Sequence, residues 1–130
     1  MIGSAMIFDL QSVGPLEQEE AGIFTWNVSA DIVFGDSSIA LLFGFPLDVA
    51  MNGQKMSAYL GRIHPDDLPA VAQEMHSAIM SSNSYSCEYR VRGALNIYRR
   101  VASCGRCFRN ADRDLTQFAG IIYPLPTMSS

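Results

Sequence analysis

The side chains best suited to proton, metal or redox chemistry in this sequence are two histidines and three cysteines. His64 stands in the run Ile63-His64-Pro65-Asp66-Asp67, where a proline and two carboxylates suit the first turn of a helix. We therefore interpret this run as a structural turn. His76 falls within the helix that follows, about 80° from the centre of its apolar face at ~100° per residue, so we expect it at the surface.

The cysteines Cys104 and Cys107 have the C-x-x-C spacing of zinc knuckles and redox motifs. Such sites need a tight turn or a helix start, but this pair lies in a predicted strand, where residues three apart point to opposite faces. Cys87 belongs to no second pair. We therefore predict structural thiols and no metal site. The sequence also has no nucleophile–base pair, phosphate loop or paired carboxylates, which indicates a protein that is not an enzyme.

The composition limits the classes of protein to consider. The chain has 130 residues, which suits one domain, and it is 48% hydrophobic and 17% charged, which favours a compact fold. Its net charge of −4 argues against a nucleic-acid-binding surface. Apolar runs are much shorter than the ~20 residues of a spanning helix, and no signal peptide is recognisable. With an odd number of cysteines, these features indicate a reduced, cytoplasmic protein without membrane insertion.

The elements that must position these side chains begin with two strands. Residues 1–14 are apolar without clear periodicity, and residues 16–21 are acidic and predict a short helix. Residues 22–28 are rich in β-branched and aromatic side chains, which favours a strand. Residues 31–35 predict a second strand, so the two are expected to pair as a hairpin.

Short helices are predicted next. Ser37 or Ser38 can cap a helix over residues 39–43, and another is expected near residues 57–61. The clearest helix begins at Leu68, because apolar residues then recur at helical spacing as far as Ile79.

The last third of the chain predicts three strands. Residues 85–92 alternate between apolar or aromatic and polar side chains, the clearest period of two in the sequence. Strands over residues 97–108 and 118–123 follow, and two prolines then end regular pairing. The element order predicts an α+β fold: a five-stranded antiparallel sheet, with the first two strands beside the last three and short helices on one face.

Five short motifs along this sequence resemble those of the PAS sensory family. They are most similar to the PAS fold-3 branch, which has a tryptophan in the first strand and a His-Pro-Asp-Asp turn. They are Gly22-Ile23-Phe24-Thr25-Trp26-Asn27, Leu42-Phe43-Gly44-Phe45-Pro46, Ile63-His64-Pro65-Asp66-Asp67, Cys87-Glu88-Tyr89-Arg90-Val91 and Phe118-Ala119-Gly120. The resemblance covers residues 22–123. It implies a sensory module of a bacterial-type signalling protein, such as a histidine kinase of a two-component system, a diguanylate cyclase or a regulator.

Three departures from the family limit what the resemblance implies. Residues 93–96 replace the usual Asp-Gly hairpin, and Arg99-Arg100-Val101 carries an arginine where the family has tryptophan. Pro124-Leu125-Pro126 replaces the Asp-Ile-Thr that usually couples the sheet to a following helix. Transmission through a continuous C-terminal helix is therefore not expected.

The family holds its ligands between the inner face of the sheet and the helices, so the same residues serve as core and as pocket. The candidates are Trp26, Phe34, Phe43, Tyr59, Met75, Ile79 and Tyr89. Some family members bind heme through a histidine on the long helix, which makes His76 the heme-ligand candidate. No cysteine lies between residues 37 and 85, which argues against cysteinyl-flavin photochemistry. No cofactor is the leading expectation, with heme and non-covalent flavin as the alternatives.

The resemblance implies that a ligand or partner changes the packing of the domain and that this change is transmitted to an effector. We divide the chain into an N-terminal extension (1–21), a sensory domain (22–124) and a tail or linker start (125–130), and expect a homodimer through the apolar N-terminal region.

A second hypothesis is a protein-docking domain with a packed interior and no ligand. A third is a small α+β enzyme, which would need an acid–base pair. A group of arginines in the predicted sheet fits either a solvated face or a docking surface for an acidic partner: Arg90, Arg92, Arg99, Arg100, Arg106 and Arg109.

Overall fold

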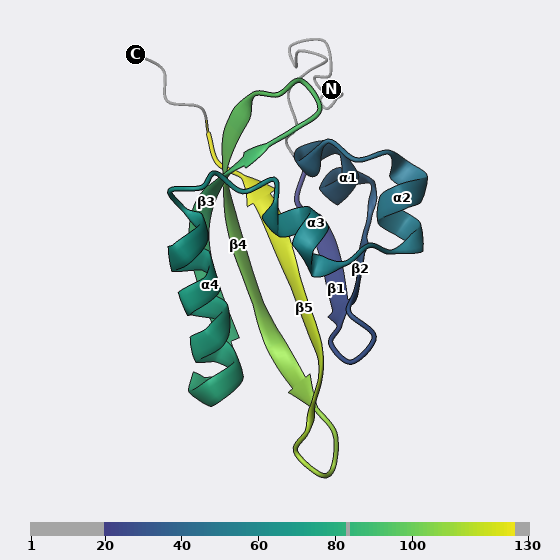
Figure 1. Cartoon of the computed structure of the whole chain (residues 1–130), viewed down its shortest axis with the longest axis vertical. Helices are drawn as coiled ribbons and strands as arrows, with labels where there is room; N and C mark the ends of the chain where they lie inside the picture. Colours follow the sequence, from purple (N-terminus) through teal and green to yellow (C-terminus); the bar gives the residue numbers. More distant parts are fainter. Residues whose placement is uncertain (1–19, 83, 127–130) are drawn as a thin grey trace, which may run out of the picture.

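One antiparallel sheet with short helices over one face makes up the computed structural model, which describes residues 20–82 and 84–126 (Figure 1). The strand order is β2-β1-β5-β4-β3, so the N-terminal hairpin pairs with the last strand. This confirms the predicted fold class and strand arrangement. The strands are β1 (Gly22–Asn27), β2 (Ile32–Gly35), β3 (Ser84–Arg92), β4 (Tyr98–Arg109) and β5 (Leu115–Pro124).

Two short helices follow β2, and one of them was not predicted. Helix α1 (Ser37–Phe43) lies where expected, but its N-cap is Asp36, whose carboxylate accepts a hydrogen bond from the Ile39 amide. Gly44 ends α1 in the left-handed conformation (φ 72°). Helix α2 (Leu47–Asn52) has Pro46 at its N-cap and no side-chain cap, so the usual start signal is missing.

The two remaining helices cover the inner face of the sheet. Helix α3 (Met56–Leu60) matches the predicted second short helix. Helix α4 (Leu68–Ser77) starts with a proline in its first turn and continues into a π-helical turn, η3 (Ala78–Ser82). Figure 1 shows α4 running alongside β3 and β4, with α3 in front of β5 and β1.

The core lies between the helices and the inner face of the sheet. Phe24, Phe43, Val91, Val101 and Ile122 are buried there in one cluster. Alternation along the strands explains the selection, because every second residue points to the helical layer. A smaller cluster around Phe118, Cys107 and Ala78 closes the far end.

The central strands approach each other closely at one pair of glycines. Gly105 of β4 pairs with Gly120 of β5, and a Cβ atom on Gly105 would lie 2.5 Å from the Ala119 carbonyl oxygen. A side chain at either position would therefore push the two strands apart. None of the helices in the described ranges is long and apolar enough to cross a membrane.

Candidate ligand cavity

A small cavity lies beneath the sheet, between its inner face and the helical layer. Its volume is about 60 Å³. Within the described part of the chain, its lining consists of aromatic, aliphatic, sulfur-bearing and hydroxyl-bearing side chains and contains no Asp, Glu, Lys, Arg or His. The cavity is therefore apolar with a few polar atoms, which is the usual character of a small-molecule site.

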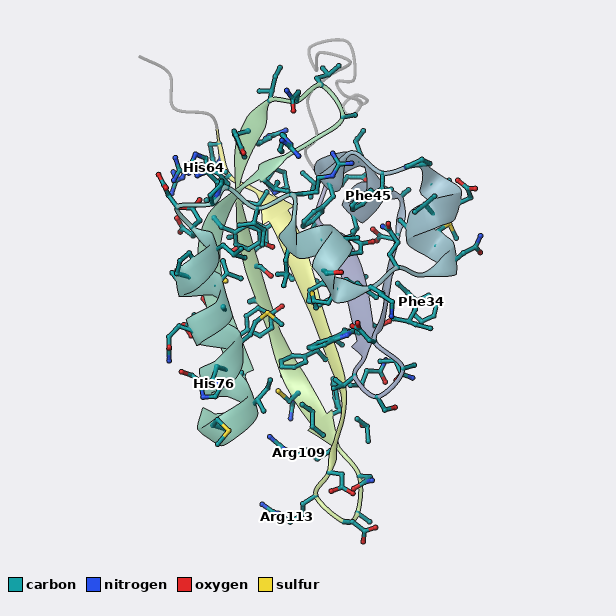
Figure 2. The ribbon with its side chains drawn as sticks, viewed as in Figure 1. Phe34, Phe45, His64, His76, Arg109 and Arg113 are labelled. Carbon is teal, nitrogen blue, oxygen red and sulfur yellow. The ribbon has the colours of Figure 1, made fainter. Side chains whose placement is uncertain are left out.

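Most of the predicted pocket residues line this cavity, and two lie elsewhere. Trp26, Phe43, Tyr59, Met75 and Tyr89 all contribute to its wall. Phe34 does not, because it alternates with the inward-pointing Val33 along β2 and is 41% exposed. Figure 2 shows Phe34 at the edge of the molecule beside β2. Ile79 also lies outside this lining, since the helix changes to a π-helical turn there and the side chain packs against the smaller cluster.

Sequence reasoning missed several lining residues. Tyr85 and Cys87 belong to the period of two in β3 that places Tyr89 inside, so this signal was present in the sequence. Met56, Ser103 and Phe118 also line the cavity. Ser103 carries no such signal, because a serine in a strand is usually a surface residue.

Two of the polar atoms in the wall contact each other. The Tyr85 hydroxyl lies 3.3 Å from the Ser103 hydroxyl, and either atom can donate. Burial raises the pKa of Tyr85, and burial likewise raises the pKa of Tyr89. Burial also raises the pKa of the Cys87 thiol to about 11. All three groups are thus neutral at physiological pH, because this environment disfavours charge.

The hydroxyl of a third lining residue, Tyr59, is closed off from the accessible space of the cavity. In the described part of the chain, the Tyr59 hydroxyl and the Gln54 amide nitrogen are both buried, and neither makes a hydrogen bond of ordinary geometry. Burial raises the pKa of Tyr59, and the interaction with the Gln54 side chain lowers it by a smaller amount, so the two groups face each other.

Trp26 links the cavity wall to the surrounding backbone. Its ring stacks on Phe118 at 5.4 Å between centroids, and its indole Nε1 donates to Asp31 Oδ1 at 3.0 Å. Asp31, in the β1–β2 turn with a positive φ of 56°, also accepts from the Met56 amide at 3.4 Å. A single carboxylate therefore joins the cavity wall, a strained turn and the first residue of α3.

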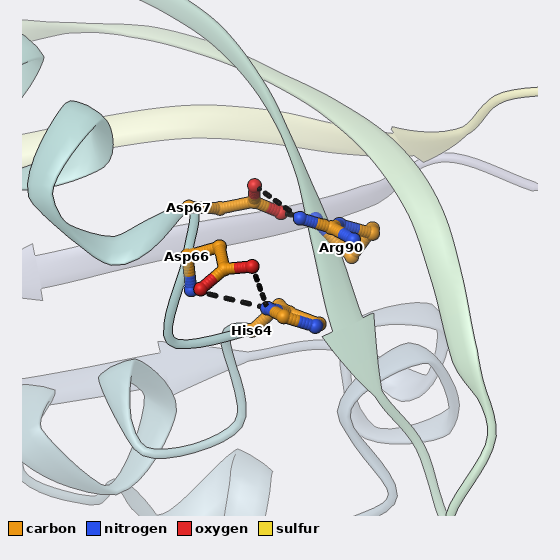
Figure 3. Close-up of polar contacts among 4 residues, drawn as sticks. All are labelled: His64, Asp66, Asp67 and Arg90. Atoms are coloured by element: carbon orange, nitrogen blue, oxygen red, sulfur yellow. Dashed lines mark hydrogen bonds and ion pairs between the residues drawn. The ribbon is translucent and has the colours of Figure 1, made fainter.

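The predicted turn at His64 is part of a polar clasp, which we define as Asp67, Arg90 and the His64 turn (Figure 3). Asp67 Oδ2 accepts from the amide and the Nε of Arg90, at 2.8 and 2.9 Å, and Asp67 Oδ1 accepts from Arg90 Nη2 at 2.8 Å. Hydrogen bonding to Arg90 lowers the pKa of Asp67 to about 2. The His64 amide donates to the Arg90 carbonyl, and His64 Nδ1 accepts from the Asp66 amide. The clasp thus fixes the start of α4 to the edge strand β3, in agreement with a structural turn.

The heme and thiol candidates lie outside this arrangement. His76 is exposed on α4 and does not line the cavity. A volume of about 60 Å³ and an uncharged wall do not fit heme or flavin, whose propionate or phosphate groups need cationic partners. Cys104 and Cys107 are free thiols on opposite faces of β4, as their spacing predicts. Among the described residues, no three His, Cys, Asp or Glu side chains cluster as metal ligands would.

The arginines in the predicted strands imply a basic outer face of the sheet, but this face also exposes apolar side chains. Ile23 of β1 lies directly opposite Ile121 of β5, and both are exposed, as is Tyr123. Arg100 pairs with Glu88 at 2.6 Å, and Arg106 lies over the Phe108 ring. The arginine group is therefore divided: Arg90 belongs to the clasp, while Arg100 and Arg106 flank an exposed apolar stripe formed by Ile23, Ile121 and Tyr123.

Comparisons with known proteins agree on one family. A family model described as a PAS fold matches residues 32–122. One similar structure is a domain of a protein from Haloarcula marismortui that is named as a light and redox sensing histidine kinase. It is 23% identical, with a TM-score of 0.70, over 85% of this chain and 93% of that one. A sensory box histidine kinase/response regulator from Burkholderia thailandensis is 22% identical with a TM-score of 0.69, over 81% and 76%. The N-terminal domain of a diguanylate cyclase with a PAS/PAC sensor from Marinobacter aquaeolei is 15% identical with a TM-score of 0.71, over 81% and 94%. No curated protein matches the chain.

Proposed function

The chain belongs to the PAS-fold family, and from that premise we propose that it is a sensory module of a bacterial-type signal-transduction protein, which binds a small molecule and does not itself catalyse a reaction. The observation that carries this proposal is the apolar cavity beneath the sheet. Similar folds in a histidine kinase and a diguanylate cyclase support a signalling context. We propose a cytoplasmic location and a histidine kinase, cyclase or regulator as the effector.

Signal transmission would start where the cavity wall meets the backbone. A ligand shifts a protein between two packings only when it binds them unequally. A molecule that displaces Trp26 or Met56 disturbs the two hydrogen bonds to Asp31, and with them the β1–β2 turn and the start of α3. This route leads from the cavity toward the hairpin that follows the N-terminal extension.

We further propose that the N-terminal extension (1–21) forms a homodimer with a second copy. Its residues 1–19 lie outside the described part, but their sequence is apolar and acidic. Residues 1–21 contain four acidic and no basic side chains, so they carry the whole net charge of −4. The exposed apolar stripe is complementary to such a segment in polarity, and Arg106 beside it is complementary in charge. The sensory domain would then span residues 22–124, with residues 125–130 as a tail or linker.

A docking domain without a ligand is the second candidate, and the small size of the cavity favours it. About 60 Å³ is a volume that side-chain repacking can close, and the arginines beside the apolar stripe suit an acidic partner. In that case the interior would be filled and the outer face alone would be functional.

Native mass spectrometry of the full chain, isolated without denaturant or solvent, separates the two candidates. Sensing predicts a molecule retained on the folded protein and released on unfolding, and less of it in Ser103→Leu, which fills the cavity. Thr25→Leu, on the outer face of β1, is the matched control and should retain the molecule. If Ser103→Leu fails to fold by circular dichroism, Val71→Ile adds a single methyl group to the same wall. A bare mass in every preparation supports the docking domain instead.

Light scattering tests the dimer separately. The full chain should be a dimer, and removal of residues 1–14 should yield a monomer. An unchanged dimer after this deletion would overturn the role of the N-terminal extension.

A further inference from the structure

The β3–β4 hairpin ends in an exposed surface that belongs to neither the cavity nor the apolar stripe. Figure 1 shows this hairpin at the opposite end of the sheet from the β4–β5 hairpin. We propose that the surface binds an acidic segment of a partner protein that also carries apolar side chains. Binding there does not require a ligand in the cavity. We call the surface the hairpin patch, and it consists of Arg62, Arg92, Leu95, Ile97, Tyr98 and Arg99.

The apolar part of the hairpin patch lies at the turn and at the start of β4. Leu95 is 57% exposed, Ile97 is 64% exposed, and Tyr98 is 41% exposed. Turns are usually formed by Gly, Pro, Asn, Asp and Ser, so two exposed aliphatic side chains here are unusual. Single exposed apolar side chains are ordinary, whereas a group of them is typical of a binding surface.

Three arginines adjoin this apolar part. Arg92 lies directly opposite Tyr98 in the β3–β4 ladder, and Arg99 lies opposite Val91. The Arg92 amide donates to the Arg62 carbonyl at 2.8 Å, so Arg62 lies on the other side of β3. The three cations are therefore gathered at one end of the sheet, beside the exposed apolar side chains.

These three arginines have no counter-ion among the described residues. Arg90 and Arg100 form ion pairs, but the three arginines of the hairpin patch do not. The Arg62 guanidinium lies over the Phe45 ring, 4.7 Å from its centroid, and such a contact holds the cation in place. Like charges on neighbouring strands repel each other, so a carboxylate brought by a partner would relieve this repulsion.

The hairpin is ordered before any partner binds. The Asn96 amide donates to the Gly93 carbonyl at 3.0 Å, and the Gly93 amide donates to the Ile97 carbonyl at 3.3 Å. The turn also packs directly on the end of α1, because a Cβ atom on Gly44 would collide with the Ala94 amide nitrogen. A preorganised surface loses little conformational entropy on binding.

The class of partner follows from the side chains and from the charge of the whole chain. A guanidinium binds a carboxylate in bidentate geometry, and Arg and Tyr are enriched at protein interfaces. The chain carries a net charge of −4, so its remaining surface repels an extended anion such as a membrane or a nucleic acid. A short acidic segment can stay within the Debye length of ~8 Å around the arginines and avoid this repulsion.

Titration of the full chain with two matched peptides tests the acidic requirement. Both are short amphipathic peptides with leucine at positions i, i+3, i+4 and i+7, and the other positions are glutamate in one and glutamine in the other. We expect the glutamate peptide to shift the amide NMR signals of Leu95 and Ile97 saturably and to leave those of Ile23 and Ile121 unmoved. The glutamine peptide should bind at least about tenfold more weakly, because it offers no carboxylate to the arginines.

Substitution of the exposed aliphatic side chains tests the apolar part. Leu95→Ser combined with Ile97→Ser should weaken binding of the glutamate peptide at least about fivefold, since the apolar contact is lost. The matched control is Ile23→Ser in the apolar stripe, which is 59% exposed and should leave the affinity unchanged. Equal affinities of the two variants would place the site outside the hairpin patch.

Substitution of the arginines tests the charged part at constant net charge. Arg92→Gln combined with Arg99→Gln should weaken binding of the glutamate peptide about tenfold and leave the glutamine peptide unaffected. Arg106→Gln combined with Arg113→Gln removes two cations elsewhere and should bind both peptides as the unmodified chain does. If the first variant is unfolded by circular dichroism, Arg99→Gln alone repeats the test with a smaller expected loss.

The remaining outcomes decide between classes of partner. Equal binding of the two peptides overturns the acidic partner, and the absence of saturable binding of either peptide overturns the hairpin patch. Sedimentation with phosphatidylglycerol vesicles that is lost in the Leu95→Ser, Ile97→Ser variant would assign the surface to a membrane instead of a protein. None of these results changes the native mass spectrometry result, which tests the cavity separately.

Discussion

The polar clasp and the apolar cavity both lie between the helices and the same sheet, but they satisfy their polar groups in opposite ways. In the clasp, both oxygens of Asp67 accept hydrogen bonds from Arg90, and the His64 turn is tied to the same strand. Beside the cavity, the Tyr59 hydroxyl and the Gln54 amide nitrogen are buried and, among the described residues, make no hydrogen bond of ordinary geometry. The clasp is therefore held by directional hydrogen bonds, whereas the cavity wall is held mainly by apolar packing.

The largest expected effect is at the closed end of the cavity, where packing alone provides stability. Phe118 is 1% exposed, stacks on Trp26 and contacts Tyr85 edge-on. Phe118→Ala should lower the free energy of unfolding by about 3–5 kcal/mol, measured by urea denaturation. Phe108→Ala removes a ring that is 44% exposed and is the control, with an expected loss below about 1 kcal/mol. Similar losses for the two variants would show that the cavity wall is not part of the core.

Disruption of the clasp should have the next largest effect. Asp67→Ala removes three hydrogen bonds that hold α4 to β3, so we expect the Tm to fall by roughly 5–10 °C. Asp66→Ala provides a neighbouring control, because that side chain is 80% exposed. Its Tm should stay within about 2 °C of the unmodified chain. A clasp that contributes nothing would give equal Tm values for the two variants.

The sequence predicts the fold well because local signals agree with the final packing. The alternation in β3 places Tyr85, Cys87 and Tyr89 inside, and the opposite faces expected for Cys104 and Cys107 follow from the same geometry. Phe34 shows the limit of this reasoning. Its aromatic character suggested the pocket, but the alternation along β2 turns Val33 inward instead.

The parts of the site that the sequence does not predict depend on residues distant along the chain. Asp67 and Arg90 are 23 residues apart, and they meet only because the start of α4 lies beside β3. The link from Trp26 through Asp31 to Met56 likewise requires α3 to pack against the β1–β2 turn. Whether a buried hydroxyl finds a partner is decided by this tertiary arrangement, so Tyr59 carries no sequence signal of its own.

Acid should weaken the clasp before it affects the cavity. Hydrogen bonding to Arg90 lowers the pKa of Asp67 from 3.8 to about 2, so its stabilising contribution is complete well above pH 4 and is lost as the pH falls toward 2. About half of the contribution should remain near pH 3. The Tm difference between the unmodified chain and Asp67→Asn should therefore shrink between pH 5 and pH 2. A difference that stays constant over this range would contradict the assigned ion pair.

The smallest expected effect on stability comes from removing single tyrosine hydroxyls. It compares a hydroxyl without a hydrogen bond of ordinary geometry, on Tyr59, with one that contacts Ser103, on Tyr85. Tyr59→Phe deletes a buried hydroxyl that, in the described part of the chain, makes no hydrogen bond of ordinary geometry, so the free energy of unfolding should stay the same or rise by up to about 1 kcal/mol. Tyr85→Phe deletes a hydroxyl that lies 3.3 Å from the Ser103 hydroxyl, so we expect a loss of about 1 kcal/mol. Urea denaturation of both variants measures the difference. If Tyr59→Phe is the more destabilised of the two, the hydroxyl of Tyr59 has a partner in solution and the contrast with the clasp does not hold.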